Sequence, residues 1–422
     1  MADLRSIDIL VFGATGYTGQ YVVNELAKLA KKYGGLTWGI AGRNKDKLQG
    51  VLRKTSEKTG TRCQDPESLR AMTSRTKVLV NCCGPYRFLG EAVVKACIES
   101  GTHHLDISTE PQYMELMQLK YHKAAEEKGV YVISACGFAS IPTDLGTVYL
   151  QKNFEGALAH FGTWESVVYW FAHWYELWRI RSKLNEQKLP ALRPKLIQCS
   201  INQLPFILNN EIVRGPWCLT FWSVDKSVIE RSQRHFFEKN EQRPAQINTY
   251  FVVSNFLIVI GLFILGLVFL LILIFNNLLF LSVSKVFTCG FVSHEGPTEE
   301  AEEHTSATFT FRGKGWSEKI WLAPVPRQDC HYQCKIFKFL QAFSSLNLIP
   351  GYGFTALSLI LCSIMTLKES GNMPGRGGVL PPAAAFRKTS LIEQLMQHDV
   401  KFEVTSSEVV PVKRSCCLSM CV

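Results

Sequence analysis

Short apolar runs alternate with longer stretches of helical spacing in the first part of the chain. The runs of strand length lie at residues 7–12, 37–41, 77–82, 103–107 and 130–134. The stretches with helical spacing lie at residues 17–32, 91–100 and 111–128. This alternation is typical of a parallel sheet covered by helices. We therefore predict an α/β fold, with a Rossmann-type doubly wound parallel sheet over residues 1–150.

One strand of that sheet has no apolar run to form it. A doubly wound sheet normally places its third strand after the second helix. The residues in that place, KTSEKTGTRCQDPESLRAMTSRT at 54–76, are mostly polar and predict helix or loop. We therefore expect the sheet to lack this edge strand.

Beyond residue 150 the pattern is less regular. We assign residues 151–370 to a second α/β domain and residues 371–422 to a C-terminal return segment and tail. Within the second domain, Trp170, Trp174 and Trp178 repeat every four residues, which predicts a tryptophan stripe on one helix. We favour a stripe buried in the core; a helix lying in a membrane interface is the alternative.

The longest apolar stretch of the chain also lies in the second domain. Residues 256–275 contain no charged side chain, and a looser apolar run covers residues 250–283. A helix of twenty residues spans about 30 Å, the hydrocarbon thickness of a bilayer. Helices buried in protein cores are rarely apolar on every side, so we predict insertion into a lipid bilayer or monolayer. We expect a hairpin or in-plane insertion, bent at Gly261 and Gly266, with both ends in the cytosol.

Composition agrees with this division. The chain has 422 residues, of which 47% are hydrophobic and 19% are charged, and its net charge is +10. Soluble chains usually have a charged fraction of about 25%, and the uncharged stretch accounts for the lower value here. The first residues lack the features of a secretory signal. We therefore expect no secretion, a location on the cytosolic face of lipid droplets or endomembranes, and reduced thiols for the 14 cysteines.

The strongest chemical signal follows the first strand. Gly13, Gly16 and Gly19 form a G-x-x-G-x-x-G pattern between a strand and a helix. Glycine lets the backbone approach a pyrophosphate, and the helix N-terminus offers unpaired N–H groups to the anion. This pattern predicts a dinucleotide site, and the alternative is a tight turn that binds nothing. The predicted binding residues are Gly13, Thr15, Gly16, Tyr17, Thr18 and Gly19.

An arginine follows the second strand. Arg43 stands where a site that prefers NAD usually has an acidic residue to bind the ribose hydroxyl. A guanidinium suits the 2′-phosphate of NADP instead, and Asn44 offers a further hydrogen bond. We therefore predict a preference for NADP(H), the alternative being that Arg43 caps the next turn.

A third signal stands at the end of the strand at 77–82. Asn81, Cys83, Gly84 and Pro85 occupy the carboxyl end of that strand, where open α/β sheets bind ligands. We expect this loop to border the nicotinamide, although Gly84 and Pro85 also suit an ordinary turn.

Groups that could transfer a proton are few. Hydride transfer to a carbon bearing oxygen or nitrogen needs a nearby acid or base. Tyr86, His104 and Asp106 are candidates by position alone, and Asp144 is a further polar group of this kind. For each of them a structural hydrogen bond is the alternative that we favour.

Other chemistries are excluded or unsupported. No tyrosine has a lysine four residues later, which excludes the Tyr-x-x-x-Lys pair of short-chain dehydrogenases. Cys330, His331 and Cys334 are too few for a zinc site, so we predict no metal. Positive charge alone does not indicate nucleic-acid binding.

Several motifs together resemble the saccharopine dehydrogenase-like oxidoreductase family. They are VFGATGYTG, AGR, NCCGPYRFLGE, ACIESG, HLDISTEPQYMELMQLKYHKAAEEKGVYVISACGF, SIPTDLG, GTW, EGPT and GGVLPPAAAF, together with the apolar segment. The resemblance covers most of the chain in order. It implies a Rossmann-type domain, a second α/β domain with a hydrophobic segment, and a C-terminal return toward the first domain. It also implies oxidoreductase activity and likeness to lipid-droplet proteins, but no substrate.

The chain departs from the family in three places, which indicates a shortened variant. The third strand and its aspartate near the adenine are missing after Gly60, and the segment before Gly162 is shorter. Ala139 replaces the aspartate of the family's Gly-Phe-Asp-Ser-Ile-Pro. We therefore expect a membrane- or lipid-droplet-associated, NADP(H)-preferring oxidoreductase that transfers hydride to an unidentified substrate. The alternative is a non-catalytic lipid-droplet or membrane protein with a vestigial nucleotide-binding fold.

Overall fold

The structure is a computed structural model of the full chain. The residues that it describes are 5–42, 44–52, 58–60, 66–153, 174–184, 207–209, 217–220, 224–240, 250–253, 260–261, 263–264, 308–312, 336–342, 352–398, 400 and 402–408.

A seven-stranded sheet forms the centre of the N-terminal domain. Its strands are β1 (Ile7–Phe12), β2 (Trp38–Gly42), β3 (Lys58–Gly60), β4 (Thr76–Asn81), β5 (His103–Asp106), β6 (Tyr131–Ile133) and β12 (Gly378–Leu380). The order across the sheet is β12-β6-β5-β4-β1-β2-β3, and all pairs are parallel. The first six strands have the Rossmann order, with the switch between β1 and β4. The predicted α/β fold with a doubly wound sheet is confirmed.

The expected loss of the third strand is wrong. Residues Lys58–Gly60 form β3, and Ile40 of β2 stands opposite Lys58 in the parallel register. A strand at the edge of a sheet needs few apolar side chains, because it is held by the backbone hydrogen bonds of one neighbour. A short polar edge strand therefore gave no apolar signal in the sequence.

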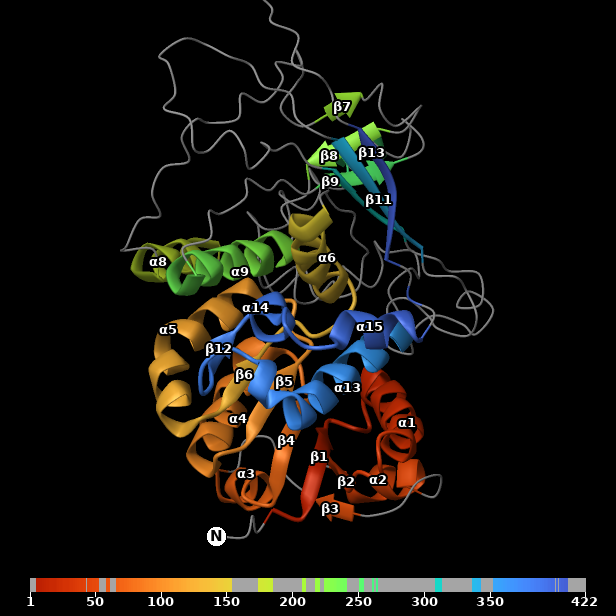
Figure 1. Ribbon diagram of the computed structural model, residues 1–422. Helices are drawn as coiled ribbons and strands as arrows, with labels where there is room; N and C mark the ends of the chain where they lie inside the picture. The colour runs from red at the N-terminus through yellow and green to blue at the C-terminus, as the bar shows by residue number, and fades with distance from the viewer. Residues whose placement is uncertain are drawn as a thin grey trace, which may run out of the picture.

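Helices cover both faces of the sheet (Figure 1). They are α1 (Tyr17–Lys32), α2 (Lys45–Leu52), α3 (Pro66–Thr73), α4 (Tyr86–Ser100), α5 (Pro111–Lys128) and α13 (Gly353–Lys368). Because side chains alternate along a strand, β1 serves both faces: Ile9 and Val11 pack in the cluster that includes α1 and α13, and Leu10 and Phe12 pack in the cluster with α3 and α4.

A second group of elements lies across the carboxyl ends of the strands. Its helices are α6 (Ser140–Asn153), α8 (Trp174–Leu184) and α9 (Val224–Asn240). Beyond them lie two antiparallel three-stranded sheets, one of β7 (Ile207–Asn209), β8 (Trp217–Thr220) and β9 (Tyr250–Val253), the other of β10 (Thr308–Arg312), β11 (Ile336–Ala342) and β13 (Glu403–Glu408). Figure 1 shows these sheets at the opposite end of the molecule from β3.

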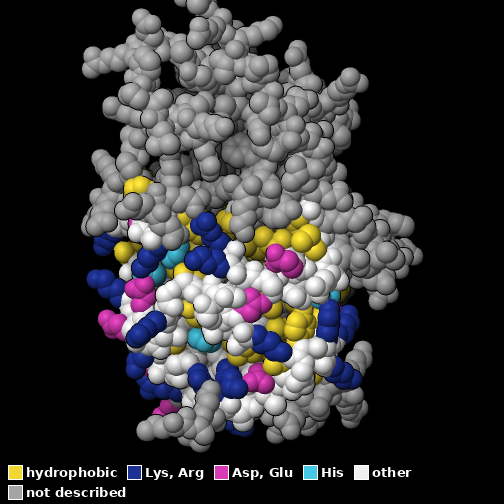
Figure 2. All heavy atoms as spheres, in the orientation of Figure 1, with side chains coloured by type: hydrophobic (Ala, Val, Ile, Leu, Met, Phe, Trp, Pro, Cys, Tyr) yellow, Lys and Arg dark blue, Asp and Glu magenta, His cyan; other side chains and the backbone are white. Residues whose placement is uncertain are grey.

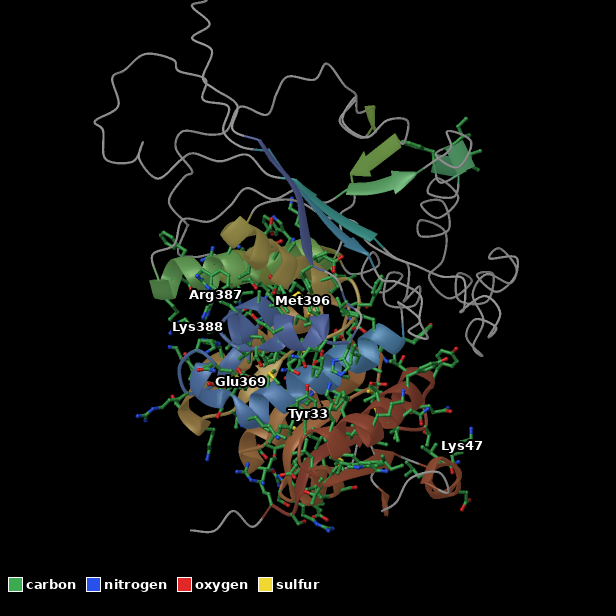
Figure 3. The ribbon with its side chains drawn as sticks, turned by 45° about the vertical axis from the view of Figure 1, so that its right-hand side comes forward. Tyr33, Lys47, Glu369, Arg387, Lys388 and Met396 are labelled. Carbon is green, nitrogen blue, oxygen red and sulfur yellow. The ribbon has the colours of Figure 1, made fainter. Side chains whose placement is uncertain are left out.

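The C-terminal part of the chain returns to the first domain. Its remaining elements are the short helix η2 (Ser370–Asn372), α14 (Pro382–Phe386) and α15 (Leu391–Met396). Lys368 and Tyr33 join α13 to the end of α1, and Glu369 accepts a hydrogen bond from the Ser390 backbone at 2.9 Å (Figure 3). Arg387 lies over the Phe236 ring at 4.5 Å and so ties α14 to α9. This return begins at Gly353, inside the predicted second domain; the predicted boundaries at 150 and 370 stay a prediction.

The apolar segment is described only in part. Its first residues form β9, and Ile260, Phe263 and Ile264 are exposed by 41%, 55% and 58%. Gly261 is described as well and is exposed, and the other residues of 250–283, Gly266 among them, lie outside the described part of the chain. No helix among the described residues is long and apolar enough to cross a membrane.

The tryptophan stripe is not buried where it can be observed. Trp178 on α8 is 70% exposed, whereas its neighbour Leu177 is buried. Trp170 lies outside the described residues. The interpretation of Trp178 as a core residue is therefore wrong, because α8 contacts α5 through another face.

Candidate dinucleotide-binding site

The glycine turn has the geometry that the sequence predicts. Gly13 has a φ of +88°, and its N–H donates to the carbonyl of Ala41 at 2.9 Å. A Cβ on Gly13 would lie 2.8 Å from Cys83 Sγ, and one on Gly19 would lie 2.2 Å from the carbonyl oxygen of Gly13. Only glycine fits at these two positions, so the turn can hold the backbone of β1 and α1 at close range.

The N-terminus of α1 is open to an anion. Gly16 is its N-cap and supplies no side-chain hydrogen bond, and the first turn contains no acidic residue. The N-terminus of α4 differs, because the Glu110 carboxylate accepts from the N–H groups of Tyr86 at 3.0 Å and Arg87 at 2.8 Å. A helix N-terminus already occupied by a carboxylate has little use for a phosphate, so α1 is the better of these two for a pyrophosphate.

The residues of the turn differ in exposure. Gly16 is exposed, Thr15, Tyr17 and Thr18 are half-buried, and Gly19 is buried. The Gln20 amide donates to the Thr15 carbonyl at 3.4 Å.

The loop after β4 lies against this turn. Asn81 Oδ1 accepts from the Cys83 N–H at 3.0 Å, and the Asn81 carbonyl accepts from Tyr86 Oη at 2.8 Å. The Gly84–Pro85 peptide bond is cis. The Cys82 N–H donates to the Phe12 carbonyl at 2.8 Å, which places the loop beside the end of β1. The structure thus brings Asn81 and Cys83 next to the end of β1 and the glycine turn, as the order of the sheet requires, and Gly84 and Pro85 follow in the same loop.

The residue after β2 is not described. Arg43 lies outside the described residues. Asn44 accepts from the Lys47 N–H at 2.9 Å and caps α2. Its Oδ1 atom is therefore engaged in the helix start.

The three candidates for proton transfer are all buried. Tyr86 donates to the Asn81 carbonyl, and burial raises its pKa well above the usual value. His104 is fully buried, its Nε2 lies 3.3 Å from Asn81 Nδ2, and burial lowers its pKa to about 3. These contacts favour the structural alternative for Tyr86 and His104.

Asp106 is the most connected of the three. Its carboxylate accepts from Ser108 N at 2.9 Å, Ser134 Oγ at 2.9 Å, Tyr113 Oη at 3.1 Å and Ala135 N at 3.3 Å. Burial raises its pKa to about 6, although these hydrogen bonds oppose the shift. Asp106 therefore joins the loops after β5 and β6 to α5.

Two residues near the site could not be predicted from the sequence. Tyr352, at the start of α13, packs edge-on against Tyr17 with ring centroids 4.7 Å apart. Thr355 accepts from the Phe138 N–H at 3.0 Å. Both come from the C-terminal return, more than 200 residues away along the chain, so no local pattern could predict them.

The loop that carries Ala139 has a constrained backbone. Ala139 has a φ of +70°, a conformation in which Asp and Asn are several times more common than other non-glycine residues. The aspartate that the resemblance implies at this position would suit this backbone, whereas alanine offers no carboxylate.

These features define an α/β protein with a dinucleotide-binding turn. A family model for the saccharopine dehydrogenase NADP binding domain matches residues 9–133, which covers β1 to β6. The saccharopine dehydrogenase-like oxidoreductase of Bos taurus is 35% identical over 440 residues, covering 96% of this chain and 99% of that protein. The chain therefore belongs to the saccharopine dehydrogenase-like oxidoreductase family, as its motifs predict, and is an NAD(P)-dependent oxidoreductase by family.

Two further relatives extend the comparison. The lipid droplet localized protein of Caenorhabditis elegans is 32% identical over 437 residues, covering 94% of this chain and 98% of that protein. Apo saccharopine dehydrogenase (L-Glu forming) from Saccharomyces cerevisiae has a similar fold, with a TM-score of 0.52 and 12% identity over 95% of this chain and all of that one. The expected shortening is small, since the chain aligns with nearly the whole length of its relatives.

Proposed function

We propose that the chain is a membrane- or lipid-droplet-associated oxidoreductase that prefers NADP(H) and transfers hydride to or from an unidentified substrate. The observation that carries this proposal is the glycine turn, where Gly13 and Gly19 admit no side chain and α1 begins without an acidic residue. NADP(H), when bound, supplies or accepts the hydride. The protein holds the cofactor at the carboxyl ends of β1, β2 and β4.

Each part of the cofactor has a proposed partner. Gly13, Thr15, Gly16, Tyr17, Thr18 and Gly19 bind the pyrophosphate, Arg43 binds the 2′-phosphate, and Asn81, Cys83, Gly84 and Pro85 border the nicotinamide. This assignment of the cofactor to the site rests on the open N-terminus of α1 and on the close approach of Cys83 to the glycine turn. Tyr86 and His104 contact Asn81 at the start of this loop. Asp106 joins the neighbouring loops after β5 and β6.

A non-catalytic role is the second candidate. Ala139 favours it, because the loop after β6 has lost a carboxylate while keeping its left-handed backbone. In that case the nucleotide-binding fold serves only as a scaffold, and no hydride acceptor exists.

Reversing the charge at Arg43 tests the cofactor preference. We expect the full chain in detergent to bind NADPH more tightly than NADH, and Arg43→Glu to weaken NADPH binding by at least about 100-fold, because a charge-assisted pair becomes a repulsive one. Isothermal titration calorimetry measures both. Lys47→Glu, a charge reversal at an exposed position on α2 (Figure 3), is the control and should leave binding unchanged. Failure of the unaltered chain to bind either nucleotide would refute the enzyme proposal.

Lipid association is proposed from the apolar stretch. Residues 250–283 contain no charged side chain, and Phe263 and Ile264 are exposed. The name of the Caenorhabditis elegans relative supports a lipid-droplet location. On the face shown in Figure 2, charged side chains of both signs are spread over the N-terminal domain. We therefore place lipid contact in the second domain, with the ends of the segment on the cytosolic side.

Charges in the apolar segment should prevent this association. We expect the double change Phe263→Asp and Ile264→Asp to reduce co-flotation with lipid droplets by at least about tenfold, since each aspartate costs roughly 3 kcal/mol in the apolar phase. The control is Phe88→Asp, which changes an exposed aromatic side chain outside the apolar segment, on α4. Equal flotation of both variants would contradict the proposal, and protease protection of the C-terminal tail in microsomes would rule out the hairpin.

A further inference from the structure

A buried arginine outside the dinucleotide site is held at one end only. Arg231 on α9 is 8% exposed, and its Nε donates to Gln118 Oε1 at 2.6 Å. Its two terminal nitrogens, Nη1 and Nη2, are buried and have no hydrogen-bond partner among the residues that the structure describes. Burying a charge without full hydrogen bonding is costly. The guanidinium is thus bound to the protein through Nε, and its other side faces a group that the described residues do not supply.

Asp144 on α6 shows the complementary arrangement. Its Oδ2 accepts from Ser232 Oγ at 2.7 Å and from the Ala383 N–H at 2.8 Å. Its Oδ1 is buried and has no hydrogen-bond partner in the described part of the chain. Asp144 and Arg231 interact electrostatically, yet their unpaired atoms do not bond to each other. A ligand group between the two side chains could form hydrogen bonds to Oδ1 of Asp144 and to Nη1 and Nη2 of Arg231.

The other carboxylates near this pair already have partners. Glu115 on α5 accepts from Arg181 Nη2 at 2.8 Å and from Ser227 Oγ at 2.6 Å. Asp225 on α9 accepts from Ser140 Oγ at 2.9 Å, and the oxygens of Asp106 accept four hydrogen bonds. Among the described residues, none of these carboxylates bonds to Nη1 or Nη2 of Arg231.

The pair lies at the edge of the sheet where ligands bind. Asp106 at the end of β5 interacts electrostatically with Arg231 and also with Cys82 in the loop after β4. Helices α6 and α9 cross above the carboxyl ends of the strands (Figure 1). In open α/β sheets this is the side of the substrate as well as of the cofactor.

We propose that Arg231 and Asp144 form a subsite for a carboxylate group of the substrate. The terminal N–H groups of a guanidinium match the two oxygens of a carboxylate, and protonated Asp144 donates a third hydrogen bond. A phosphate would bring a second negative charge close to Glu115, Asp106 and Asp225, so the carboxylate fits better. This subsite rests on the proposed oxidoreductase function and assigns its substrate to the carboxylic acids.

Binding at this subsite should be linked to a proton. Burial, with a smaller contribution from Asp225, raises the pKa of Asp144 to about 7, although the hydrogen bonds from Ala383 and Ser232 and the charge of Arg231 oppose the shift. A bound carboxylate favours the protonated form of Asp144. Affinity is therefore highest below about pH 7 and falls about tenfold for each pH unit well above it.

Acetate is the probe, because it is the smallest carboxylate that can form these bonds. We expect the full chain to broaden the NMR signal of ¹³C-labelled acetate at about pH 6, with affinity about tenfold weaker at pH 9 than at pH 8. Arg231→Met should remove binding, whereas Arg234→Met, on the same helix and paired with Glu238, should retain it. Asp144→Asn should bind acetate with no pH dependence, because the amide is permanently neutral and still donates a hydrogen bond.

Three results would overturn the subsite. They are no acetate binding by the unaltered chain up to about 0.1 M at pH 6, unchanged binding in Arg231→Met, and a pH profile that survives in Asp144→Asn. If Arg231→Met does not fold, the pH dependence of acetate binding to Asp144→Asn still tests the subsite. NADPH binding, measured separately, distinguishes the two proposals: acetate binding without NADPH binding refutes the cofactor assignment alone, and the reverse refutes the subsite alone.

Discussion

Replacing Gly19 with alanine is expected to abolish binding of the dinucleotide. The added Cβ would lie 2.2 Å from the carbonyl oxygen of Gly13 and 3.0 Å from Cα of Ala14, and both are backbone atoms. The backbone must therefore move, and the turn would lose the close approach on which the pyrophosphate site depends. We expect NADPH affinity to fall by at least about 100-fold, which corresponds to roughly 2.7 kcal/mol. Calorimetric titration of the full chain measures this loss.

A second glycine variant separates the local clash from a general effect of alanine. Gly371 in η2 has no heavy atom within 4 Å of an added Cβ. Gly371→Ala should therefore leave NADPH binding unchanged. Thermal unfolding shows whether Gly19→Ala is still folded, and we expect overpacking to lower its free energy of unfolding by about 1–3 kcal/mol. Gly19→Ala that binds NADPH like the unaltered protein would refute the pyrophosphate assignment.

The sequence predicted the sheet well because buried parallel strands are apolar over their whole length. The runs at 7–12, 77–82 and 103–107 correspond to β1, β4 and β5 within one residue at either end. The first strand also shows why such runs are continuous: Ile9 and Leu10 pack on opposite faces of the sheet. The glycine turn was predictable for a related reason, since its positions follow directly from the strand and helix on either side.

Predictions failed where the fold depends on distant or polar contacts. The helix expected at 91–100 begins at Tyr86, because Glu110, 24 residues later, caps its N-terminus. Trp178 is exposed although its spacing suited a core, since periodicity identifies a helical face without saying what covers it. Arg231 gave no signal at all, since its burial depends on the packing of α9 against other helices, among them α5, α6 and α14.

Asp106 was a candidate for proton transfer by position alone, and its contacts favour the structural alternative. Its place at a strand end suggested proton transfer, but four donors surround its carboxylate, and it is fully buried. A proton donor or acceptor must reach the substrate, whereas these contacts direct both oxygens toward the protein. The same position thus contributes to the geometry of the site through the loops that it joins.

Removing this carboxylate should cause a large loss of stability. In Asp106→Ala the N–H groups of Ser108 and Ala135 would be buried without an acceptor, and the hydroxyls of Tyr113 and Ser134 would lose theirs. An unsatisfied buried group costs about 1–3 kcal/mol, so we expect a decrease of about 3–6 kcal/mol in the free energy of unfolding. Chemical denaturation of the full chain measures it.

Asp106→Asn is the matched control, because its amide oxygen still accepts from the two backbone N–H groups and its NH₂ can donate to the hydroxyls. Its loss of free energy of unfolding should be clearly smaller than that of Asp106→Ala.

The pH dependence of stability gives a second measurement. The pKa of Asp106 is raised to about 6 in the fold, so between about pH 4 and pH 6 the folded state holds a proton that the unfolded state has released. The contribution of Asp106 to stability is therefore present in full below about pH 4 and declines as the pH rises to about 6. Relative to Asp106→Asn, the unaltered protein should lose stability over this range, and a difference that does not change with pH would show that Asp106 stays ionised in the fold.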